Sequence, residues 1–329
     1  MRHQKPHDRR CSYLVVIDDR QSRPEPLREL ATYLSTLSVA DCDVVVVDVS
    51  PADVFARNDR VLRWVARHVA PQPRHRVDGA VDSVRAAVDL AACEKVIVAA
   101  AEVRYDELEI DQLCTLLDMH EVVEPQDYLD PLPWWGGIDA GRMLVHRGVE
   151  PLPDHGTTFG FRRSALRGLR GIDVQAMVCD DQVRRLAAQG AEVHSASDVF
   201  VRRTPPPLAL WIDERLRQAT DDFEVPVKTA FFFALLPMAI LLAAFGGLRM
   251  AGGYAGAIAC GSLLLALRGR MGAGAFFPLR ACLFAPLWVF ERSVSVYAAL
   301  YRKLRGGELA PTGLPIAERG HGDQVASGE

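Results

Sequence analysis

The first hundred residues alternate between short apolar runs and amphipathic patterns. Apolar, β-branched runs, which are typical of strands, occupy residues 12–17, 44–47 and 96–101. Apolar positions recur at helical spacing over residues 26–37, 61–69 and 81–92. Continuous apolar strands between amphipathic helices predict a parallel sheet that is covered on both faces. Ligands of such sheets bind at the carboxyl ends of the strands, so Asp48 and residues 99–102 are candidate site positions.

Residues 103–222 continue the soluble region with weaker periodicity. They contain a Pro- and Trp-rich stretch at 125–139, a predicted helix at 181–189, a short strand at 199–202 and a basic helix at 211–220. Three consecutive prolines at 205–207 predict a rigid linker. The sequence lacks the Gly-rich motifs of dinucleotide-binding and P-loop proteins, which argues against both classes.

The next stretch predicts a membrane hairpin. Residues 229–248 hold no charged side chain, and twenty residues at 1.5 Å each are enough to cross about 30 Å of hydrocarbon. Residues 252–267 form a shorter, Gly- and Ala-rich second arm, with the turn expected at 249–251. Basic residues lie at the open end of this hairpin, namely Lys228, Arg268 and Arg270. Positive charge marks the cytoplasmic side, so both ends are expected in the cytoplasm.

A further amphipathic pattern follows the hairpin. Between residues 283 and 304, apolar side chains recur every three or four positions and are accompanied by several arginines. This pattern favours a helix in the membrane interface, with its cations toward anionic headgroups. A third span kinked at Pro286 is the alternative, but Arg280 and Glu291 would limit it to about ten apolar residues.

These patterns divide the chain into five parts. We expect a disordered N-terminus (1–11), a soluble domain (12–225), a transmembrane hairpin (226–268), an amphipathic interfacial region (269–306) and a disordered tail (307–329). The first residues are charged and show no signal-peptide pattern, so the soluble domain and the tail are expected on the cytoplasmic side of the cell membrane.

Composition narrows the functional classes. The net charge of −4 argues against nucleic-acid binding, which needs a basic surface. The seven cysteines are scattered without a CxxC pair, a pattern that suits a reducing compartment and argues against a disulfide framework or a zinc site.

Four stretches together resemble the bacterial family 2 glycosyltransferases. They are VVVVDVSPAD (44–53), VAAAEVRY (98–105), the Pro-Gln block EPQDYLDPLPWWGGIDAGRMLVHR (124–147) and WIDERLRQATDDF (211–223). The resemblance, which extends from about residue 12 to residue 307, implies an α/β, GT-A-like (Rossmann-like) mixed sheet with helices on both faces. The membrane hairpin and interfacial helix would follow it.

The resemblance implies roles for particular residues. Asp181, with Asp180 as second choice, would be the base that takes the proton of the acceptor hydroxyl. Asp48 would contact the donor base, and Arg217 the donor diphosphate. Residues that would line the acceptor site are Trp134, Trp135 and Asp139. From the residues alone, each also has a structural interpretation: a turn or helix cap for the aspartates, core packing for the tryptophans and a solvated helix charge for Arg217.

The expected metal site departs from the family pattern. Where the family has a run of aspartates, this chain has Ala100, Ala101 and Glu102. Mg²⁺ or Mn²⁺ in such sites is held by carboxylates and substrate phosphates, and alanine cannot contribute. Three hypotheses remain: weak metal binding through Glu102, catalysis without metal using Arg217 and its neighbours, or loss of transfer activity.

The sequence therefore predicts a membrane-anchored, inverting glycosyltransferase. Its partners would be a nucleotide-sugar donor, a lipid-linked or glycan acceptor close to the membrane, and membrane lipids. The alternative is a catalytically inactive membrane scaffold or partner subunit. A nucleotidyltransferase is a further alternative, but the alanines count equally against its metal-dependent chemistry.

Overall fold

The computed structural model describes residues 9–18, 22–77, 80–149, 157–168, 182–221, 223 and 226–305. At its centre is an eight-stranded sheet with the order β3-β2-β1-β6-β9-β8-β10-β7. In chain order the strands are β1 (Cys11–Ile17), β2 (Cys42–Asp48), β3 (Arg67–Val69), β6 (Lys95–Ala100), β7 (Val103–Arg104), β8 (Val122–Leu129), β9 (Thr158–Arg162) and β10 (Val193–Arg203). A separate two-stranded ribbon pairs β4 (Arg76–Val77) with β5 (Ala80–Val81). The predicted α/β class with a mixed sheet is confirmed.

The strand directions define two edges of the sheet. β1, β2, β3 and β6 run parallel to one another. β9 runs antiparallel to both β6 and β8, and β10 runs parallel to β8. The carboxyl ends of β1, β2, β3, β6, β8 and β10 therefore lie at the same edge, which we call the carboxyl edge, and their starts lie at the amino edge.

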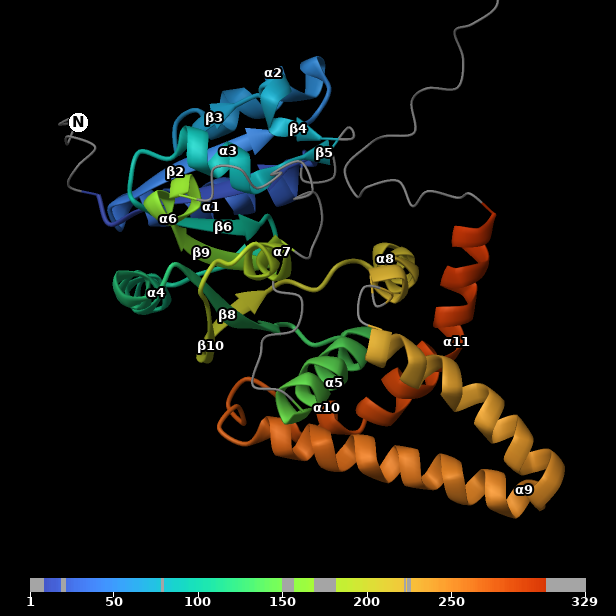
Figure 1. Cartoon of the computed structure of the whole chain (residues 1–329). Coiled ribbons are helices and arrows are strands. Elements are labelled where there is room, and N and C mark those ends of the chain that lie inside the picture. The colour runs from blue at the N-terminus through green and yellow to red at the C-terminus, as the bar shows by residue number, and fades with distance from the viewer. Residues whose placement is uncertain are drawn as a thin grey trace, which may run out of the picture.

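Helices cover both faces of the sheet, as the apolar strands predict (Figure 1). These helices are α1 (Pro24–Val39), α2 (Ala52–Leu62), α3 (Ser83–Leu90), α4 (Glu107–Met119), α6 (Arg163–Gly168) and α7 (Gln182–Ala188). Tyr13 and Val15 of β1 share a buried cluster with α1 and α4, whereas Leu14 shares another with α3 and α7. Successive side chains of a strand point to opposite faces, so β1 contributes to both cores.

The helix predicted over residues 61–69 is wrong in its position. α2 ends at Leu62, whose carbonyl accepts hydrogen bonds from the amides of Val65 and Ala66 in the turn after the helix. Residues 67–69 form β3, which pairs in parallel with residues 45–47 of β2. The hydrogen bonds offered by β2 outweigh the weak helical spacing of this segment, as tertiary context commonly does.

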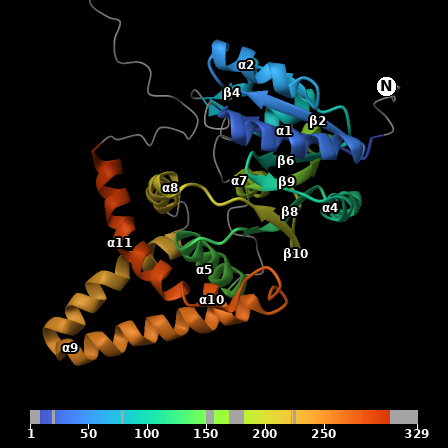
Figure 2. The ribbon, with the colours of Figure 1, turned by 180° about the vertical axis from the view of Figure 1, so that it is seen from behind.

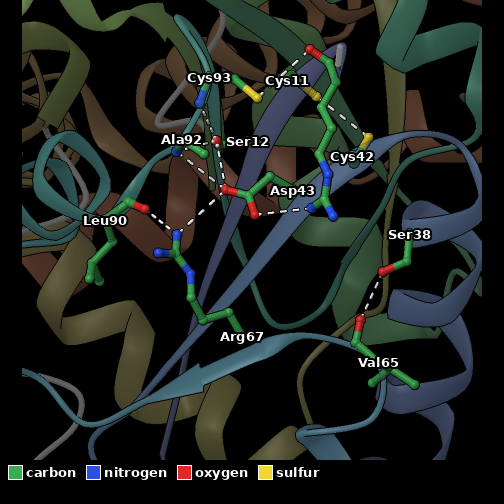
Figure 3. A network of polar contacts seen from close by, with 11 residues as sticks. Cys11, Ser12, Ser38, Cys42, Asp43, Val65, Arg67, Leu90, Ala92 and Cys93 are labelled. Atoms are coloured by element: carbon green, nitrogen blue, oxygen red, sulfur yellow. Dashed lines mark hydrogen bonds and ion pairs between the residues drawn. The ribbon is translucent and has the colours of Figure 1, made fainter. Parts of the chain in front are cut away.

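A polar network joins several segments at the amino edge (Figure 3). Asp43 of β2 accepts hydrogen bonds on Oδ1 from Nη1 of Arg9 (3.2 Å) and on Oδ2 from the Ser12 hydroxyl (3.1 Å). The same Oδ2 accepts from Nη2 of Arg67 (3.4 Å) and from the amide of Ala92 (3.3 Å). One carboxylate thus connects β1, β2, β3 and the loop before β6. At the amino edge, the hydrogen bonds of Asp43 hold these segments of the fold together.

The remaining helices pack together against Tyr128 of β8 and Phe200 of β10. They are α5 (Trp134–Val149), α8 (Leu208–Asp221), α9 (Pro226–Arg270), α10 (Leu279–Cys282) and α11 (Ala285–Leu304). Leu144 of α5, Phe232 of α9 and Trp288 of α11 belong to the same buried cluster. Figures 1 and 2 place α5 between the sheet and α9, so the helix that follows β8 connects the sheet to the C-terminal helices.

α9 is bent into two diverging arms (Figure 1). The bend lies at Gly247, whose backbone has φ of 76° and ψ of 175° inside an otherwise continuous helix. Glycine adopts positive φ without the steric cost that a side chain brings. The turn therefore lies at Gly247 and not at the predicted residues 249–251.

Most apolar side chains of α9 face away from the protein. Phe245 and Leu248, beside the bend, are 88% and 86% exposed. The helices Val227–Arg270 and Leu279–Leu304 are long and apolar enough to cross a membrane, by length and composition alone. In the most apolar stretch of the first of these, 11% of residues are buried, against 39% in the second. α11 is the more covered helix because it packs against α5, α8 and α9.

Candidate functional site

Charged residues gather at the carboxyl edge of the sheet. Asp48 is the last residue of β2, Glu102 follows β6, and Arg203 is the last residue of β10. Asp127 lies two residues before the end of β8. The edge predicted from the strand pattern to carry a site is therefore the edge where these four side chains lie.

Asp48 is buried and hydrogen-bonded through both carboxylate oxygens. Its Oδ1 accepts from the amide of Ser50 (2.9 Å), and its Oδ2 accepts from Nδ2 of Asn58 (2.8 Å). The same Oδ2 is 3.0 Å from Nε2 of His68, whose Nδ1 is 3.1 Å from Oδ1 of Asp59. Asp48 orders the turn that follows β2, and its contact with a donor base remains a prediction.

The pKa values of Asp48 and His68 are shifted in the directions that favour an ion pair between the two side chains. Burial by itself would raise the pKa of Asp48, but hydrogen bonds from His68, Ser50 and Asn58 outweigh it and hold the pKa below its usual range. Burial would lower the pKa of His68, but Asp48 and Asp59 outweigh it and raise that pKa. The two shifts widen the pH range in which the Asp48 carboxylate and the His68 imidazolium form an ion pair.

We expect this pair to make stability depend on pH. A histidine whose pKa is raised by folding stabilises the protein below its unfolded pKa of about 6.5, and the stabilisation is lost as pH rises through the folded pKa. Between about pH 6 and 9 the melting temperature of wild type should fall relative to that of His68→Gln by a few degrees, since 1 kcal/mol corresponds to about 2–4 °C.

The measurement is a thermal unfolding series on both proteins in the same buffers. Burial also raises the pKa of Asp82 to about 6 and that of Glu109 to about 7. Both groups are present in wild type and in His68→Gln, so their effect on stability is the same in the two proteins. The difference between the curves isolates His68, and two parallel curves would contradict its pairing with Asp48.

Arg203 lies between two carboxylates, on the strand next to the end of the sheet. Its Nη1 is 3.4 Å from Oδ2 of Asp127, and its Nε is 3.9 Å from Oε1 of Glu102. The backbone holds the same corner, because the amide of Thr204 donates to the carbonyl of Glu102 (3.0 Å). The Thr157 hydroxyl also donates to Oδ2 of Asp127 (3.2 Å).

The three charged side chains differ in their exposure to solvent. The side chains of Asp127 and Arg203 are 2% and 8% exposed, whereas that of Glu102 is 36% exposed. Burial raises the pKa of Asp127, and the nearby charges of Arg203 and Arg142 counteract it in part. Arg203 thus has a buried inner partner and an outer partner that faces solvent.

A second buried charge cluster lies between α5 and α8. Asp139 accepts hydrogen bonds on Oδ2 from Nε1 of Trp211 (2.7 Å) and on Oδ1 from Nη2 of Arg215. Nε of Arg142 is 3.5 Å from Oδ1 of Asp139. Burial would raise the pKa of Asp139, but Arg215, Arg142 and Arg203 outweigh it and lower that pKa. The clusters around Asp127 and Asp139 are therefore electrostatically connected.

α11 contributes a side chain to the same region. Arg292 is buried, and it donates to the carbonyl of Arg215 (3.5 Å) and to Oε1 of Gln218 (3.4 Å). Gln218 also accepts a hydrogen bond from Nη2 of Arg215 (2.6 Å). One side chain of α11 thus reaches the charge cluster between α5 and α8.

Comparison with solved structures identifies the fold. A mannosyltransferase from Pyrobaculum calidifontis, in complex with GDP-Man and Mn²⁺, aligns with a TM-score of 0.50 and 17% identity, covering 89% of this chain and 88% of that chain. This chain has a GT-A-like glycosyltransferase fold. The predicted resemblance is confirmed at the level of the fold.

Two further structures are more distant. A candidate nucleotide-diphospho-sugar transferase from Desulfovibrio desulfuricans aligns with a TM-score of 0.38 and 13% identity, covering 64% of this chain and 87% of that chain. A mycobacterial protein aligns with a TM-score of 0.41 and 15% identity, covering 63% and 72%. Neither a protein-family model nor a curated protein matches the sequence.

The residues of this glycosyltransferase fold do not fit the metal that the resemblance implies. Ala100 and Ala101 have no ligand atom in their side chains, and the carboxylate of Glu102 faces the guanidinium of Arg203. Within the described part of the chain, no three His, Cys, Asp or Glu side chains are placed to hold a metal ion. The guanidinium of Arg203 already lies beside the carboxylate of Glu102.

The structure places the other predicted site residues as follows. Trp134, at the start of α5, is 62% exposed, whereas Trp135 is half-buried and donates from Nε1 to the carbonyl of Pro206 (3.2 Å). Of these two rings, that of Trp134 is the more exposed, and the role of either in an acceptor site stays a prediction. Arg217 lies on α8, with its side chain outside the described atoms. Asp180 and Asp181 lie outside the described residues.

Sequence reasoning missed several charged residues of the site. These are Asp127, Arg142, Arg203 and Arg215. The available signal was weak: Asp127 and Arg203 lie near the ends of β8 and β10, and both strands hold other polar residues as well. A buried charge in a strand needs a partner. The identity of each partner depends on how the strands pair.

Proposed function

We propose that this protein is a membrane-anchored glycosyltransferase that moves a sugar, with inversion, from a nucleotide-diphosphate donor to a lipid-linked or membrane-proximal acceptor. The observation that carries the proposal is the glycosyltransferase fold with Asp48, Glu102, Asp127 and Arg203 at its carboxyl edge. Ligands of α/β sheets bind at that edge. Donor binding there would bring the diphosphate close to the buried arginines.

The position of the apolar helices supports a membrane-proximal acceptor. α5 and α8 follow strands that end at the carboxyl edge, and both pack against α11. α9 packs against α5 and exposes apolar side chains. A site at this edge would therefore lie near the membrane surface, where lipid-linked acceptors are found.

Donor binding is the first test. The purified full-length protein would be titrated with UDP- and GDP-sugars, with and without Mn²⁺, while thermal stability and nucleotide release are followed. We expect one class of donor to raise the melting temperature, because a ligand that binds the folded state stabilises it. Binding of no donor under any condition would sink the transferase proposal. It would favour the inactive scaffold, the candidate that Ala100 and Ala101 suggest.

Asp181 is the proposed base, and its variant tests the chemistry. Asp181→Asn should lower turnover by about 10²–10⁴-fold, the usual contribution of a general base, while donor binding changes little. Asp180→Asn is the matched control, because it removes the same charge from the neighbouring residue and should keep most turnover. If only the control loses activity, the base is Asp180.

The proposed anchor predicts a defined orientation. In sealed vesicles, protease should cut the tail after residue 306 only when it is added on the cytoplasmic side, since basic residues flank the open end of the hairpin. Cleavage from the opposite face would refute the hairpin. Full release of the protein by alkaline carbonate would refute anchoring altogether.

A further inference from the structure

At the corner that follows β6, the guanidinium of Arg203 lies beside the residues where the resemblance implies a metal. Ala100 ends β6, Ala101 and Glu102 follow it, and β7 begins at Val103. Arg203 is paired with Val103 across the antiparallel ladder of β10 and β7. The register of this ladder therefore brings Arg203 beside the segment that would hold the ligands of a metal.

The position of Arg203 is held on both sides. In the parallel ladder of β10 and β8, Arg203 pairs with Leu129, and its carbonyl accepts the amide of Asp130 (3.1 Å). On its inner side, Nη1 contacts the buried carboxylate of Asp127 at 3.4 Å. Because the backbone and one nitrogen are fixed, the charge of Arg203 has a defined place at the carboxyl edge.

We propose that Arg203 takes the place of a divalent cation, so that donor binding and sugar transfer require no metal. The inference rests on the function proposed above and names the group that neutralises the donor diphosphate. Three observations carry it: Ala100 and Ala101 supply no ligand, Glu102 already faces a cation, and that cation lies on the edge where donors bind.

The transfer step requires a positive charge at this place. The acceptor hydroxyl oxygen forms a bond to the anomeric carbon, and the bond from that carbon to the diphosphate oxygen breaks. The nucleoside diphosphate departs with the electron pair, and the hydroxyl proton passes to the carboxylate base. Negative charge thus increases on the diphosphate, and a fixed cation stabilises it in the transition state more than in the ground state.

The contacts of Arg203 suit this role. Its contact with Glu102 is 3.9 Å long, beyond hydrogen-bond distance, and Glu102 is the more exposed partner. A diphosphate carries more negative charge than one carboxylate, and guanidinium binds phosphate oxygens in a bidentate manner. The donor would therefore displace Glu102 from Arg203, while Asp127 keeps the guanidinium in position.

The decisive measurement compares donor binding with and without metal. Full-length protein in detergent would be titrated calorimetrically with UDP, GDP and their sugar conjugates, in excess EDTA and in Mn²⁺. We expect the nucleotide that binds to have the same affinity in both buffers within about threefold, which is less than 1 kcal/mol. Titration with MnCl₂ alone should show no stoichiometric site.

Variants assign the effect to Arg203. Arg203→Met should weaken binding in EDTA by about 10–100-fold, the usual cost of losing a charged hydrogen bond, and Arg203→Lys by less. Arg202→Met is the matched control, because it removes the same charge from the adjacent, exposed residue of β10 and should leave affinity unchanged. Arg203→Met combined with Asp127→Asn guards against misfolding, since it leaves no unpaired buried carboxylate.

The outcomes separate this inference from the proposed function. Donor binding that needs Mn²⁺, or that survives Arg203→Met in EDTA, would overturn the role of Arg203 and leave a glycosyltransferase. Absence of donor binding in every buffer would overturn the proposed function, and the inference with it. Metal-independent binding that is lost in the folded Arg203→Met variant is the result expected.

Discussion

Replacing Gly148 by alanine is expected to separate the C-terminal helices from the sheet. A Cβ atom at Gly148 would lie 2.1 Å from the carbonyl oxygen of Leu265 in α9, and one at Gly269 would lie 1.9 Å from that of Leu144 in α5. Both obstacles are backbone atoms, so no side-chain rotation relieves the clash. α5 and α9 cross here backbone against backbone, and only a residue without a side chain permits that distance.

The expected cost is large because the two helices must move apart as units. Overpacking a core usually costs about 1–3 kcal/mol, and a clash with the main chain should reach the upper end of that range or exceed it. Moving α9 away from α5 would also expose the cluster that contains Leu144 and Phe232. Thermal unfolding of the purified variant in detergent measures the effect, and we expect Gly269→Ala to behave in the same way.

The long helix provides its own controls. Gly256 and Gly261 lie in α9, where an added Cβ would have no atom within 4 Å apart from the neighbouring residues and nearby backbone of the helix itself. Gly256→Ala and Gly261→Ala should leave the melting temperature unchanged or raise it, because alanine favours the helix by up to about 1 kcal/mol. Equal melting temperatures for Gly148→Ala and Gly256→Ala would show that α5 and α9 do not cross at this distance.

Replacing Asp139 by alanine is the second change with a large expected effect. It leaves Arg215 and Arg142 buried without the carboxylate that they share, and it removes the acceptor of the Trp211 indole. Removing one partner of a buried ion pair costs about 3–5 kcal/mol, because the remaining charge stays desolvated. α8 should lose its attachment to α5, and chemical denaturation would record the loss.

A double-mutant cycle distinguishes burial from simple loss of a contact. Asp139→Ala combined with Arg215→Met should be less destabilised than the sum of the single variants, because it removes both charges. Asp118→Ala is the control: its contact with Lys95 is short, at 2.6 Å, but Asp118 is 65% exposed. That change should cost less than about 1 kcal/mol. Equal costs for Asp139→Ala and Asp118→Ala would contradict the burial argument.

The two variants test different properties of one junction. Gly148 and Gly269 permit the close packing of α5 and α9, and Asp139 holds α8 against α5 through Arg215. If both predictions hold, the backbone contact and the buried ion pair each help to hold the C-terminal helices against the rest of the protein.

Residues of the first half show what could be predicted locally. The runs at 12–17 and 44–47 lie within β1 and β2, and the run at 96–101 matches β6 except for its last residue. Strands that are buried on both faces must be largely apolar. The pattern at 61–69 failed because β3 has only three residues and its structure depends on pairing with β2. Short edge strands carry too little sequence pattern to predict.

The C-terminal region shows a similar division. Its apolar length predicted two hairpin arms, and both lie in α9, which is long and apolar enough to cross a membrane. The second helix of that length and composition, Leu279–Leu304, covers the segment predicted to lie in the interface. The position of the bend at Gly247 follows from backbone conformation, and no pattern distinguished that glycine from its neighbour Gly246. The packing of α11 against α5, α8 and α9 also depends on contacts between distant segments.

By itself the sequence determined the α/β pattern, the apolar helices, the strand end at Asp48 and the corner at residues 99–102, because each depends on neighbouring residues. The tertiary structure alone decided which charges meet. Asp127 and Arg203 are 76 positions apart, as are Asp139 and Arg215, and strand register and helix packing bring each pair together. Because these side chains are buried, each charge needs a partner, since an unpaired charge in the interior costs several kcal/mol.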